Sequence, residues 1–199
     1  MRVGFYNFVW SLMRVIYGLI HPHRVHGLEN LPDEGGFVLC INHFSNHDPL
    51  YVAASMPKSR RMHFLAKKQL FDNKFLCPIV TWLGAIPVDR GNADISAIRT
   101  ALKVVKDGCA LGIFPQGTRS KDNSPTPMLN GASMIALRAG APVIPAYVDG
   151  PYRLFRHTDV FFGPALDLSA YGRRCDSATL TEVTHQIESA IWGMRRAKS

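Results

Sequence analysis

The sequence predicts an α/β fold, in which one domain contains a mixed, largely parallel sheet flanked by helices and follows an N-terminal helical segment. Three observations support this prediction. The chain has 199 residues, 47% of them hydrophobic, which suits one domain with a substantial core. Short apolar runs alternate with stretches of helical period. No linker, internal repeat or low-complexity tract divides the chain.

The first element is a helix within residues 1–20, whose apolar side chains recur near helical spacing. Arg2, Asn7 and Arg14 interrupt the apolar run, which leaves it too short for the roughly 20 apolar residues that cross a bilayer. Aromatic side chains suit a membrane interface, and here they are Tyr6, Trp10 and Tyr17. We expect residues 1–23 to form an amphipathic helix on or in a membrane surface, ahead of a domain at 24–199. The alternative is a first helix packed in the core.

The next elements alternate regularly up to residue 88. Pro22 ends the first helix, and Gly35-Gly36 precedes a continuous apolar run at 37–43 that predicts a buried strand. Asp48 and Pro49 are typical of a helix start, with aspartate as the N-cap. The elements that follow are a helix at 50–56, a strand at 62–67, a helix at 77–84 and a strand at 85–88.

The second half of the chain continues the alternation. Residues 94–108 form an amphipathic helix that ends at Gly108. After it come a buried strand at 109–115, a helix at 131–140, a strand at 142–148 and a C-terminal amphipathic helix at 176–196. The prolines of 142–148 favour an edge strand. Alternating strands and helices predict a largely parallel sheet, whose strand ends carry the functional loops.

The charge and the cysteines narrow the partners and the compartment. A formal net charge of +8 favours an anionic partner, namely nucleic acid, an anionic membrane or a phosphorylated substrate. The aromatic residues follow apolar runs instead of interleaving with a basic patch, which disfavours nucleic acid. The four cysteines are widely spaced, which excludes a C-x-x-C zinc or redox motif and favours a reducing compartment.

The stretch "NHFSNHD" follows the predicted strand at 37–43 and contains His43 and Asp48. A histidine at a strand end and an aspartate at the next helix start can meet across the turn. The carboxylate would then hold one ring nitrogen, which frees the other to take a proton from a hydroxyl. This arrangement lacks the serine of a hydrolase triad, so the nucleophile can be the substrate's own hydroxyl. The plain alternative is a helix cap beside an unrelated histidine.

A metal site is another interpretation of the same stretch. His43 and His47 have the spacing of a helical zinc pair, and Asp48 follows them. However, the predicted helix starts only after both histidines, and the other histidines stand apart. A third ligand is therefore not evident, and we expect no metal.

Two further strand ends carry residues suited to phosphate. "FPQGTRS" at 114–120 offers Gly117 for close backbone approach, the Thr118 hydroxyl, and Arg119 as a planar, permanently charged donor. "GAIPVDR" at 84–90 ends in Arg90, and Lys67 ends the strand at 62–67. Each could equally be an ordinary solvated residue.

Together these segments resemble the glycerolipid acyltransferase family, typified by the 1-acyl-sn-glycerol-3-phosphate acyltransferases. The family motifs N-H-x-x-x-x-D, G-x-I-x-x-x-R and F-P-E-G-T-R-S match "NHFSNHD", "GAIPVDR" and "FPQGTRS" in order. An apolar strand with proline, "VIPAYV", matches the fourth motif. The resemblance covers about residues 24–170.

The resemblance implies a function for each matching residue. His43 would be the general base and Asp48 its orienting partner. Arg90, Gly117 and Arg119 would bind the phosphate or glycerol part of the acceptor. From their positions beside these residues, Lys67, Gln116 and Thr118 are further candidates for substrate binding. One departure is Gln116, which stands where the family has glutamate. Gln116 keeps the length but loses a charge, which would free Arg119 for phosphate, shift the choice of acceptor, or weaken activity.

The resemblance also implies the reaction. An acyl-CoA or acyl-carrier protein thioester would acylate the free hydroxyl of 1-acyl-glycerol-3-phosphate and give phosphatidate for phospholipid biosynthesis. No cofactor or metal is implied, and the enzyme would be peripheral or monotopic on the cytoplasmic face of a membrane. The alternatives are another lysolipid or glycerol-3-phosphate as acceptor, a metal-dependent phosphoesterase, and a non-catalytic membrane-binding protein.

Overall fold

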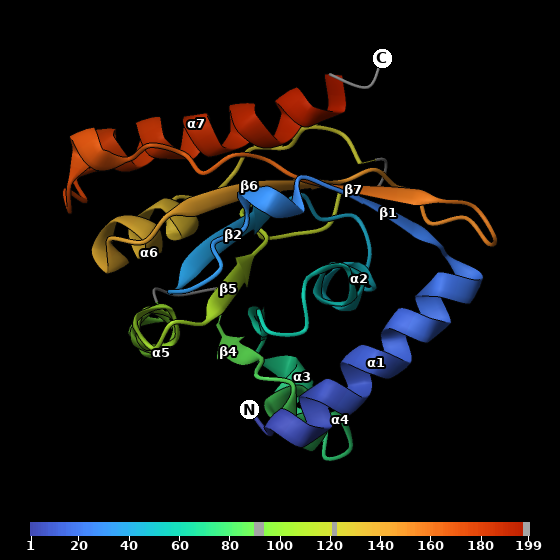
Figure 1. Cartoon of the computed structure of the whole chain (residues 1–199). Coiled ribbons are helices and arrows are strands. Elements are labelled where there is room, and N and C mark those ends of the chain that lie inside the picture. Colours follow the sequence, from blue (N-terminus) through green and yellow to red (C-terminus); the bar gives the residue numbers. More distant parts are fainter. Residues whose placement is uncertain (90–93, 121–122, 197–199) are drawn as a thin grey trace.

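The computed structural model describes residues 1–89, 94–120 and 123–196. These residues form a sheet with strand order β1-β7-β6-β2-β5-β3-β4 (Figure 1). All neighbouring strands are parallel except β6 and β7. The strands are β1 His23–His26, β2 Phe37–Ile41, β3 Met62–Lys67, β4 Ile86–Val88, β5 Ala110–Ile113, β6 Val143–Val148 and β7 Thr158–Phe162. The predicted α/β fold is confirmed.

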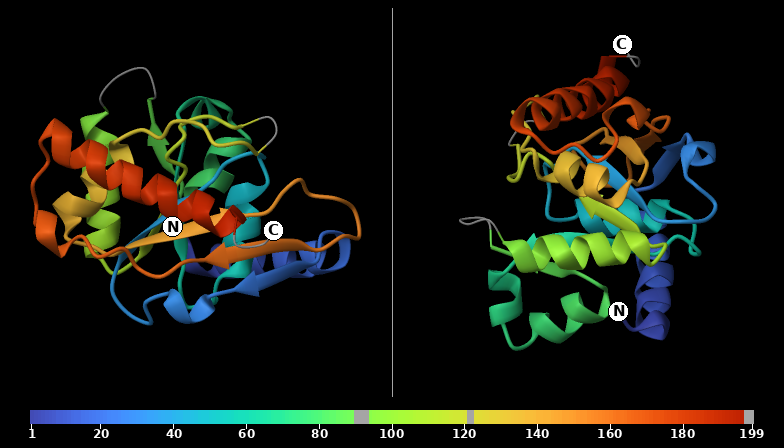
Figure 2. Two further views of the ribbon diagram at one scale, coloured as in Figure 1. Left: turned by 90° about the horizontal axis from the view of Figure 1, so that it is seen from above. Right: turned by 90° about the vertical axis from the view of Figure 1, so that its left-hand side faces the viewer.

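Helices cover both faces of the sheet (Figures 1 and 2). They are α1 Val3–Ile20, α2 Asp48–Ser55, α3 Gln69–Asp72, α4 Leu76–Trp82, α5 Ile95–Lys106, α6 Gly131–Ala139 and α7 Ser177–Arg196. One core cluster joins the sheet to α5, α6 and α7, and the other joins it to α1 and α2. Both faces are therefore buried, which explains the continuous apolar runs of β2 and β5.

The prediction that residues 142–148 form an edge strand is wrong. This strand lies inside the sheet, between β2 and β7, and is not an edge strand. The Pro145 carbonyl accepts a hydrogen bond from the amide of Gly163 (2.8 Å), just beyond the last residue of β7. The amide and carbonyl positions of a strand residue point to the same side, so the missing N–H of Pro145 also faces Gly163, and the ladder with β2 loses no donor. β1 and β7 were not predicted.

The helix α1 lies along the outside of the domain and presents two different faces. Tyr6 and Tyr17 are buried, and the indole of Trp10 donates a hydrogen bond to the Ala53 carbonyl (3.0 Å). The opposite side carries an exposed apolar stripe at helical spacing, made of Phe8, Leu12, Val15 and Leu19. By length and composition alone, α1 is also apolar enough to cross a membrane. The alternative of a core-packed helix therefore accounts only for the aromatic side of α1.

The parallel strands bring two of the three motif segments to one edge of the sheet. β2 pairs with β5 in parallel, so the segments that follow them, residues 42–47 and 114–120, leave the sheet side by side. β3 pairs with β5 on the other side, which places Lys67 at the same edge. Arg90, at the end of the third segment, lies outside the described residues. The expected gathering of strand ends is thus present for the residues that the structure describes.

Candidate active site

His43 and Asp48 form a close pair at this edge. His43 lies two residues beyond β2, and Asp48 is the first residue of α2. The Nδ1 atom of His43 is 2.7 Å from the Oδ2 atom of Asp48, and both residues are buried. Because an ionised carboxylate only accepts hydrogen bonds, Nδ1 carries the proton in this pair and Nε2 has a free lone pair. The expected pairing of these two residues is present.

The Asp48 carboxylate has a different role from the helix cap expected for it. The cap residue of α2 is His47, and it makes no side-chain cap hydrogen bond. Instead, Asp48 Oδ2 accepts hydrogen bonds from the backbone amides of Phe44 (2.8 Å) and Ser45 (2.9 Å), which lie upstream. The turn between His43 and Asp48 is therefore folded around the carboxylate. This turn fixes the orientation of Asp48 toward the imidazole.

Tyr152 is a site residue that sequence reasoning missed. It lies in the loop after β6, and its hydroxyl donates a hydrogen bond to Asp48 Oδ1 (2.8 Å). Burial raises the pKa of Tyr152 well above its usual value, and the negative charge of Asp48 is the second cause of this rise. The hydroxyl therefore stays protonated and remains a donor. No local motif marks this position, since Tyr152 is distant from Asp48 in the sequence.

The backbone of His43 is held on both sides by the segment 114–120. The side-chain oxygen of Gln116 accepts a hydrogen bond from the His43 amide, and the Ser120 amide donates to the His43 carbonyl (2.8 Å). The other end of the Gln116 amide donates to the Thr126 hydroxyl. Gly117 adopts φ +67°, a left-handed conformation that favours glycine and allows the tight turn of this segment. Gln116 is thus bonded to protein groups at both ends of its amide.

The imidazole of His43 also packs against aromatic rings. It stacks on Phe114, with ring centroids 4.2 Å apart and an interplanar angle of 25°. Phe114 in turn stacks on Phe64 of β3, with centroids 5.8 Å apart. Stacking and the Asp48 hydrogen bond together restrict rotation of the ring. The side chain is therefore preorganised to accept a proton at Nε2.

Asn42 fixes the end of β2 next to the His43–Asp48 pair. Its side chain accepts a hydrogen bond from the Val148 amide (2.7 Å) and donates to the Val148 carbonyl (2.9 Å). It also donates to the side-chain oxygen of Asn123 (2.7 Å). These buried bonds tie the end of β2 to the end of β6. The first residue of the sequence motif therefore has a structural role, while the second, His43, pairs with Asp48.

The residues expected to contact phosphate differ in how near the structure places them to the His43–Asp48 pair. Arg119 is exposed and donates through Nη1 to Asn46 Oδ1 (2.8 Å), within the turn between His43 and Asp48. Thr118 precedes it and is also exposed. Lys67 is exposed at the end of β3. The structure thus brings Arg119 to the His43–Asp48 turn, whereas Arg90 lies outside the described residues.

The metal interpretation finds no ligand set within residues 1–89, 94–120 and 123–196. No group of three histidine, cysteine, aspartate or glutamate side chains in these ranges could hold a metal ion. His47 has another environment, since its Nδ1 atom is 3.3 Å from the Tyr17 hydroxyl of α1. His43 and His47 therefore contact different partners.

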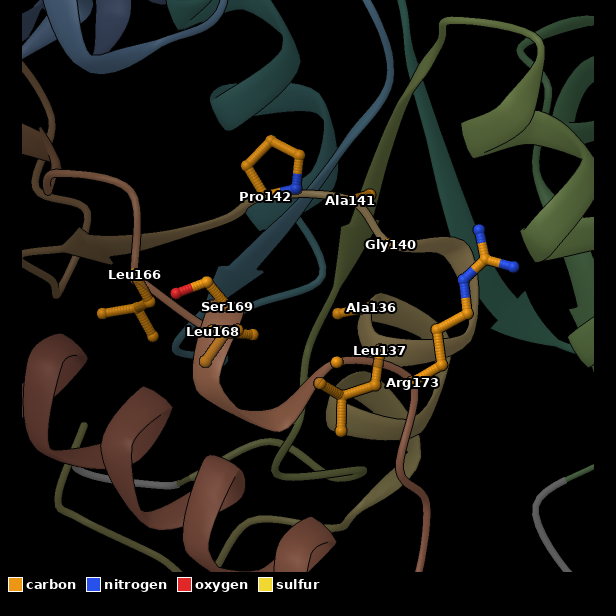
Figure 3. A pocket seen from close by; sticks show the side chains of 10 residues that line it. Ala136, Leu137, Gly140, Ala141, Pro142, Leu166, Leu168, Ser169 and Arg173 are labelled. Carbon is orange, nitrogen blue, oxygen red and sulfur yellow. The ribbon is translucent and has the colours of Figure 1, made fainter.

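A separate hollow of about 350 Å³ lies between the end of α6, the start of β6 and residues 166–173 (Figure 3). Pro142 lines it just before β6 begins. β6 is parallel to β2. Pro142 precedes β6 and His43 follows β2, so the two residues lie at opposite ends of the strands. The hollow is therefore remote from the His43–Asp48 pair.

The comparison with protein families identifies the class of this site. A family model described as Acyltransferase matches residues 22–149, which is more than half of the chain. The chain belongs to the acyltransferase family. The matched range includes His43, Asp48 and the segment 114–120, so the hydrogen-bonded pair described above lies within the acyltransferase region.

Named relatives agree with this assignment. The acyltransferase is 36% identical over 146 residues to a 1-acyl-sn-glycerol-3-phosphate acyltransferase of Bacillus subtilis (strain 168), covering 73% of this chain and 72% of that protein. It is 28% identical over 193 residues to a protein of the same name from Streptococcus pneumoniae (strain ATCC BAA-255 / R6), covering 93% and 71%. The protein is therefore an O-acyltransferase.

A solved structure supports the fold. The acyltransferase resembles the crystal structure of the 1-acyl-sn-glycerophosphate acyltransferase PlsC from Thermotoga maritima, with a TM-score of 0.76 and 21% sequence identity. The match covers 98% of this chain and 80% of the other. At this identity the likeness establishes the shared fold.

Replacing Tyr152 with phenylalanine is expected to lower kcat about tenfold, because Asp48 loses a hydrogen bond made to a charged group. KM for both substrates should stay nearly constant, because the lost hydroxyl bonds to Asp48 and is not expected to contact either substrate. The ratio of wild-type to variant kcat should be the same from about pH 6 to about pH 9, because the raised pKa of Tyr152 keeps the hydroxyl protonated throughout. Steady-state kinetics across this range would check the prediction. An unchanged kcat would contradict it.

Proposed function

We propose that this acyltransferase transfers a fatty acyl group from a thioester to the free hydroxyl of 1-acyl-glycerol-3-phosphate. The observation that carries the proposal is the preorganised His43–Asp48 pair with a free Nε2 lone pair at the strand edge. The named relatives supply the substrate class, since two of them are 1-acyl-sn-glycerol-3-phosphate acyltransferases. An acceptor that carries phosphate and a fatty chain also suits a basic protein with an exposed apolar helix.

The reaction follows from the geometry of the pair. Nε2 of His43 takes the proton of the acceptor hydroxyl as its oxygen attacks the thioester carbonyl. A tetrahedral oxyanion forms, and its collapse breaks the carbon–sulfur bond and releases the thiolate. The protonated imidazole then returns the proton to the leaving sulfur. Asp48 stabilises the positive ring between these two steps, and no covalent acyl-enzyme is needed.

We assign acceptor binding to the basic and small residues beside the pair. Arg119 is anchored to Asn46, so its guanidinium is positioned beside the turn that carries His43. Gly117, Thr118 and Lys67 complete the proposed phosphate side, and Arg90 is included from its place in the motif. Gln116 acts instead as a positioning residue, because its amide bonds to the His43 backbone and to Thr126. A neutral amide provides both bonds, so Gln116 is compatible with an active enzyme.

We place the enzyme on the cytoplasmic face of a membrane as a peripheral or monotopic protein. The exposed stripe of α1, with Phe8 and Leu19 exposed by 64% and 71%, supports contact with lipid. The proposed division assigns residues 1–23 to this membrane helix and residues 24–199 to the acyltransferase domain. The family match begins at residue 22, close to this boundary. The donor is acyl-CoA or acyl-carrier protein.

The proposal is tested by following thiol release from palmitoyl-CoA with and without 1-acyl-glycerol-3-phosphate, in the presence of EDTA. We expect release that depends on the acceptor and survives EDTA, together with formation of phosphatidate. Glycerol-3-phosphate and a lysophosphatidylcholine serve as alternative acceptors. Palmitoyl-acyl carrier protein serves as the alternative donor and separates the two thioester classes.

The outcomes of this assay separate the alternatives. Phosphate release that EDTA abolishes would support a metal-dependent phosphoesterase and overturn the proposal. Faster turnover with glycerol-3-phosphate or another lysolipid would reassign the acceptor within the family. Silence with every donor and acceptor would favour a non-catalytic membrane-binding protein.

A further inference from the structure

The loop between β6 and β7 has an exposed apolar tip. Leu154 and Phe155 are exposed by 66% and 76%, and no role in the catalytic pair accounts for them. Arg153 and Arg156 flank these two residues and are also exposed. Two large apolar side chains between two arginines form a compact amphipathic tip. Such exposure has a cost in water and marks a surface that contacts a partner.

The tip is joined to the end of α1. The Phe155 amide donates a hydrogen bond to the Ile20 carbonyl (2.7 Å), and His21 Nδ1 is 3.1 Å from the Arg153 carbonyl. Figures 1 and 2 show the loop beside the C-terminal end of α1. Leu19, at this end, is exposed by 71%. The tip therefore lies next to the end of α1 that carries the exposed Leu19.

The backbone of the tip supports a functional role. Phe155 adopts φ +57°, in the left-handed region that a bulky residue rarely occupies. Its amide bond to Ile20 holds it there, while its ring remains in solvent. Backbone conformations of this kind are energetically costly and cluster at functional sites, where the surrounding structure holds them. The strain is an observation independent of the exposed apolar area.

We propose that the tip Arg153–Arg156 is a second lipid-contacting element, which inserts Leu154 and Phe155 into an anionic phospholipid surface beside α1. The inference rests on the membrane location proposed above. A bilayer fits both features of the tip, since its acyl region takes the apolar side chains and its phosphates pair with the two arginines. Tyr152 precedes the tip directly and bonds to Asp48. Lipid contact at the tip therefore places the catalytic pair next to the membrane that holds the acceptor.

The test measures sedimentation of the full chain with vesicles, without donor or acceptor. Vesicles of phosphatidylglycerol and phosphatidylcholine in equal amounts are compared with pure phosphatidylcholine. The double substitution Leu154→Ser and Phe155→Ser should weaken partitioning to the anionic vesicles about tenfold or more. The double substitution Arg153→Gln and Arg156→Gln should lower the ratio of partitioning to anionic over neutral vesicles roughly tenfold.

The matched control is Ile95→Ser, because Ile95 is exposed by 61% on α5, which packs on the opposite face of the sheet. We expect no change in its partitioning. Thermal unfolding of each variant shows that it is folded, and the arginine variant tests the tip even if the serine variant is unstable. Unchanged partitioning of the folded tip variants, or an equal loss in the control, would overturn the proposal. Vesicle binding needs no turnover, so this result is independent of the proposed reaction.

Discussion

Replacing His43 with alanine is expected to reduce kcat at least about a thousandfold, because the acceptor hydroxyl loses its general base. The Nδ1 atom of the His43 imidazole lies 2.7 Å from the Asp48 carboxylate, which leaves Nε2 to accept the proton. KM for the thioester should change little, since the lost step is proton transfer. Initial rates of thiol release over a range of thioester concentrations, with acceptor present, would determine kcat and KM.

The matched control for this prediction is His47→Ala. His47 is only four residues from His43, but it is exposed and contacts Tyr17 of α1. We expect its kcat to stay within about threefold of the wild-type value, as for a surface substitution. Equal losses in the two variants would contradict a His43–Asp48 base and favour a shared metal site. Thermal unfolding of both proteins separates loss of chemistry from loss of fold.

The sequence predicted the central strands because they are buried on both faces. β2 and β5 are continuous apolar runs, and such a run indicates a buried strand whichever strands pair with it. β1 is an edge strand of the sheet, and β7 is the strand next to it. In both strands, more buried and less buried side chains alternate. β1 reads His-Arg-Val-His, a polar run that becomes a strand only by pairing with β7. Such a strand depends on tertiary contacts that no local pattern encodes.

The His43–Asp48 pair was predictable for a local reason, and its surroundings were not. His43 and Asp48 are five residues apart, so one turn decides whether they meet. Tyr152 reaches the same carboxylate from a loop 104 residues away, which local spacing does not reveal. The predicted contact of Gln116 with the acceptor stays a prediction, and the hydrogen bond of its amide to the His43 backbone was not foreseen from the sequence. Long-range hydrogen bonds are thus the part of the site that sequence reasoning cannot place.

The same network sets the second large effect, at Asp48. Its carboxylate accepts four hydrogen bonds, from His43, Phe44 and Ser45 at Oδ2 and from Tyr152 at Oδ1. In an Asp48→Asn variant, the three N–H donors at Oδ2 require the amide oxygen at that position. The amide nitrogen then faces Tyr152, whose hydroxyl can also accept a hydrogen bond. Asparagine therefore keeps the imidazole tautomer and removes only the negative charge.

We expect Asp48→Asn to lower kcat about a hundredfold, through weaker stabilisation of the protonated imidazole. Asp48→Ala should lower it about a thousandfold or more, because the ring also loses its orientation. The alanine variant also leaves buried donors unpaired, which costs about 1–3 kcal/mol for each group and lowers the melting temperature. Kinetics and thermal unfolding of the two variants measure these differences. If asparagine and alanine gave equal activity, orientation by Asp48 would have no role beyond its charge. If the alanine variant kept the wild-type rate, His43 would not depend on Asp48 at all.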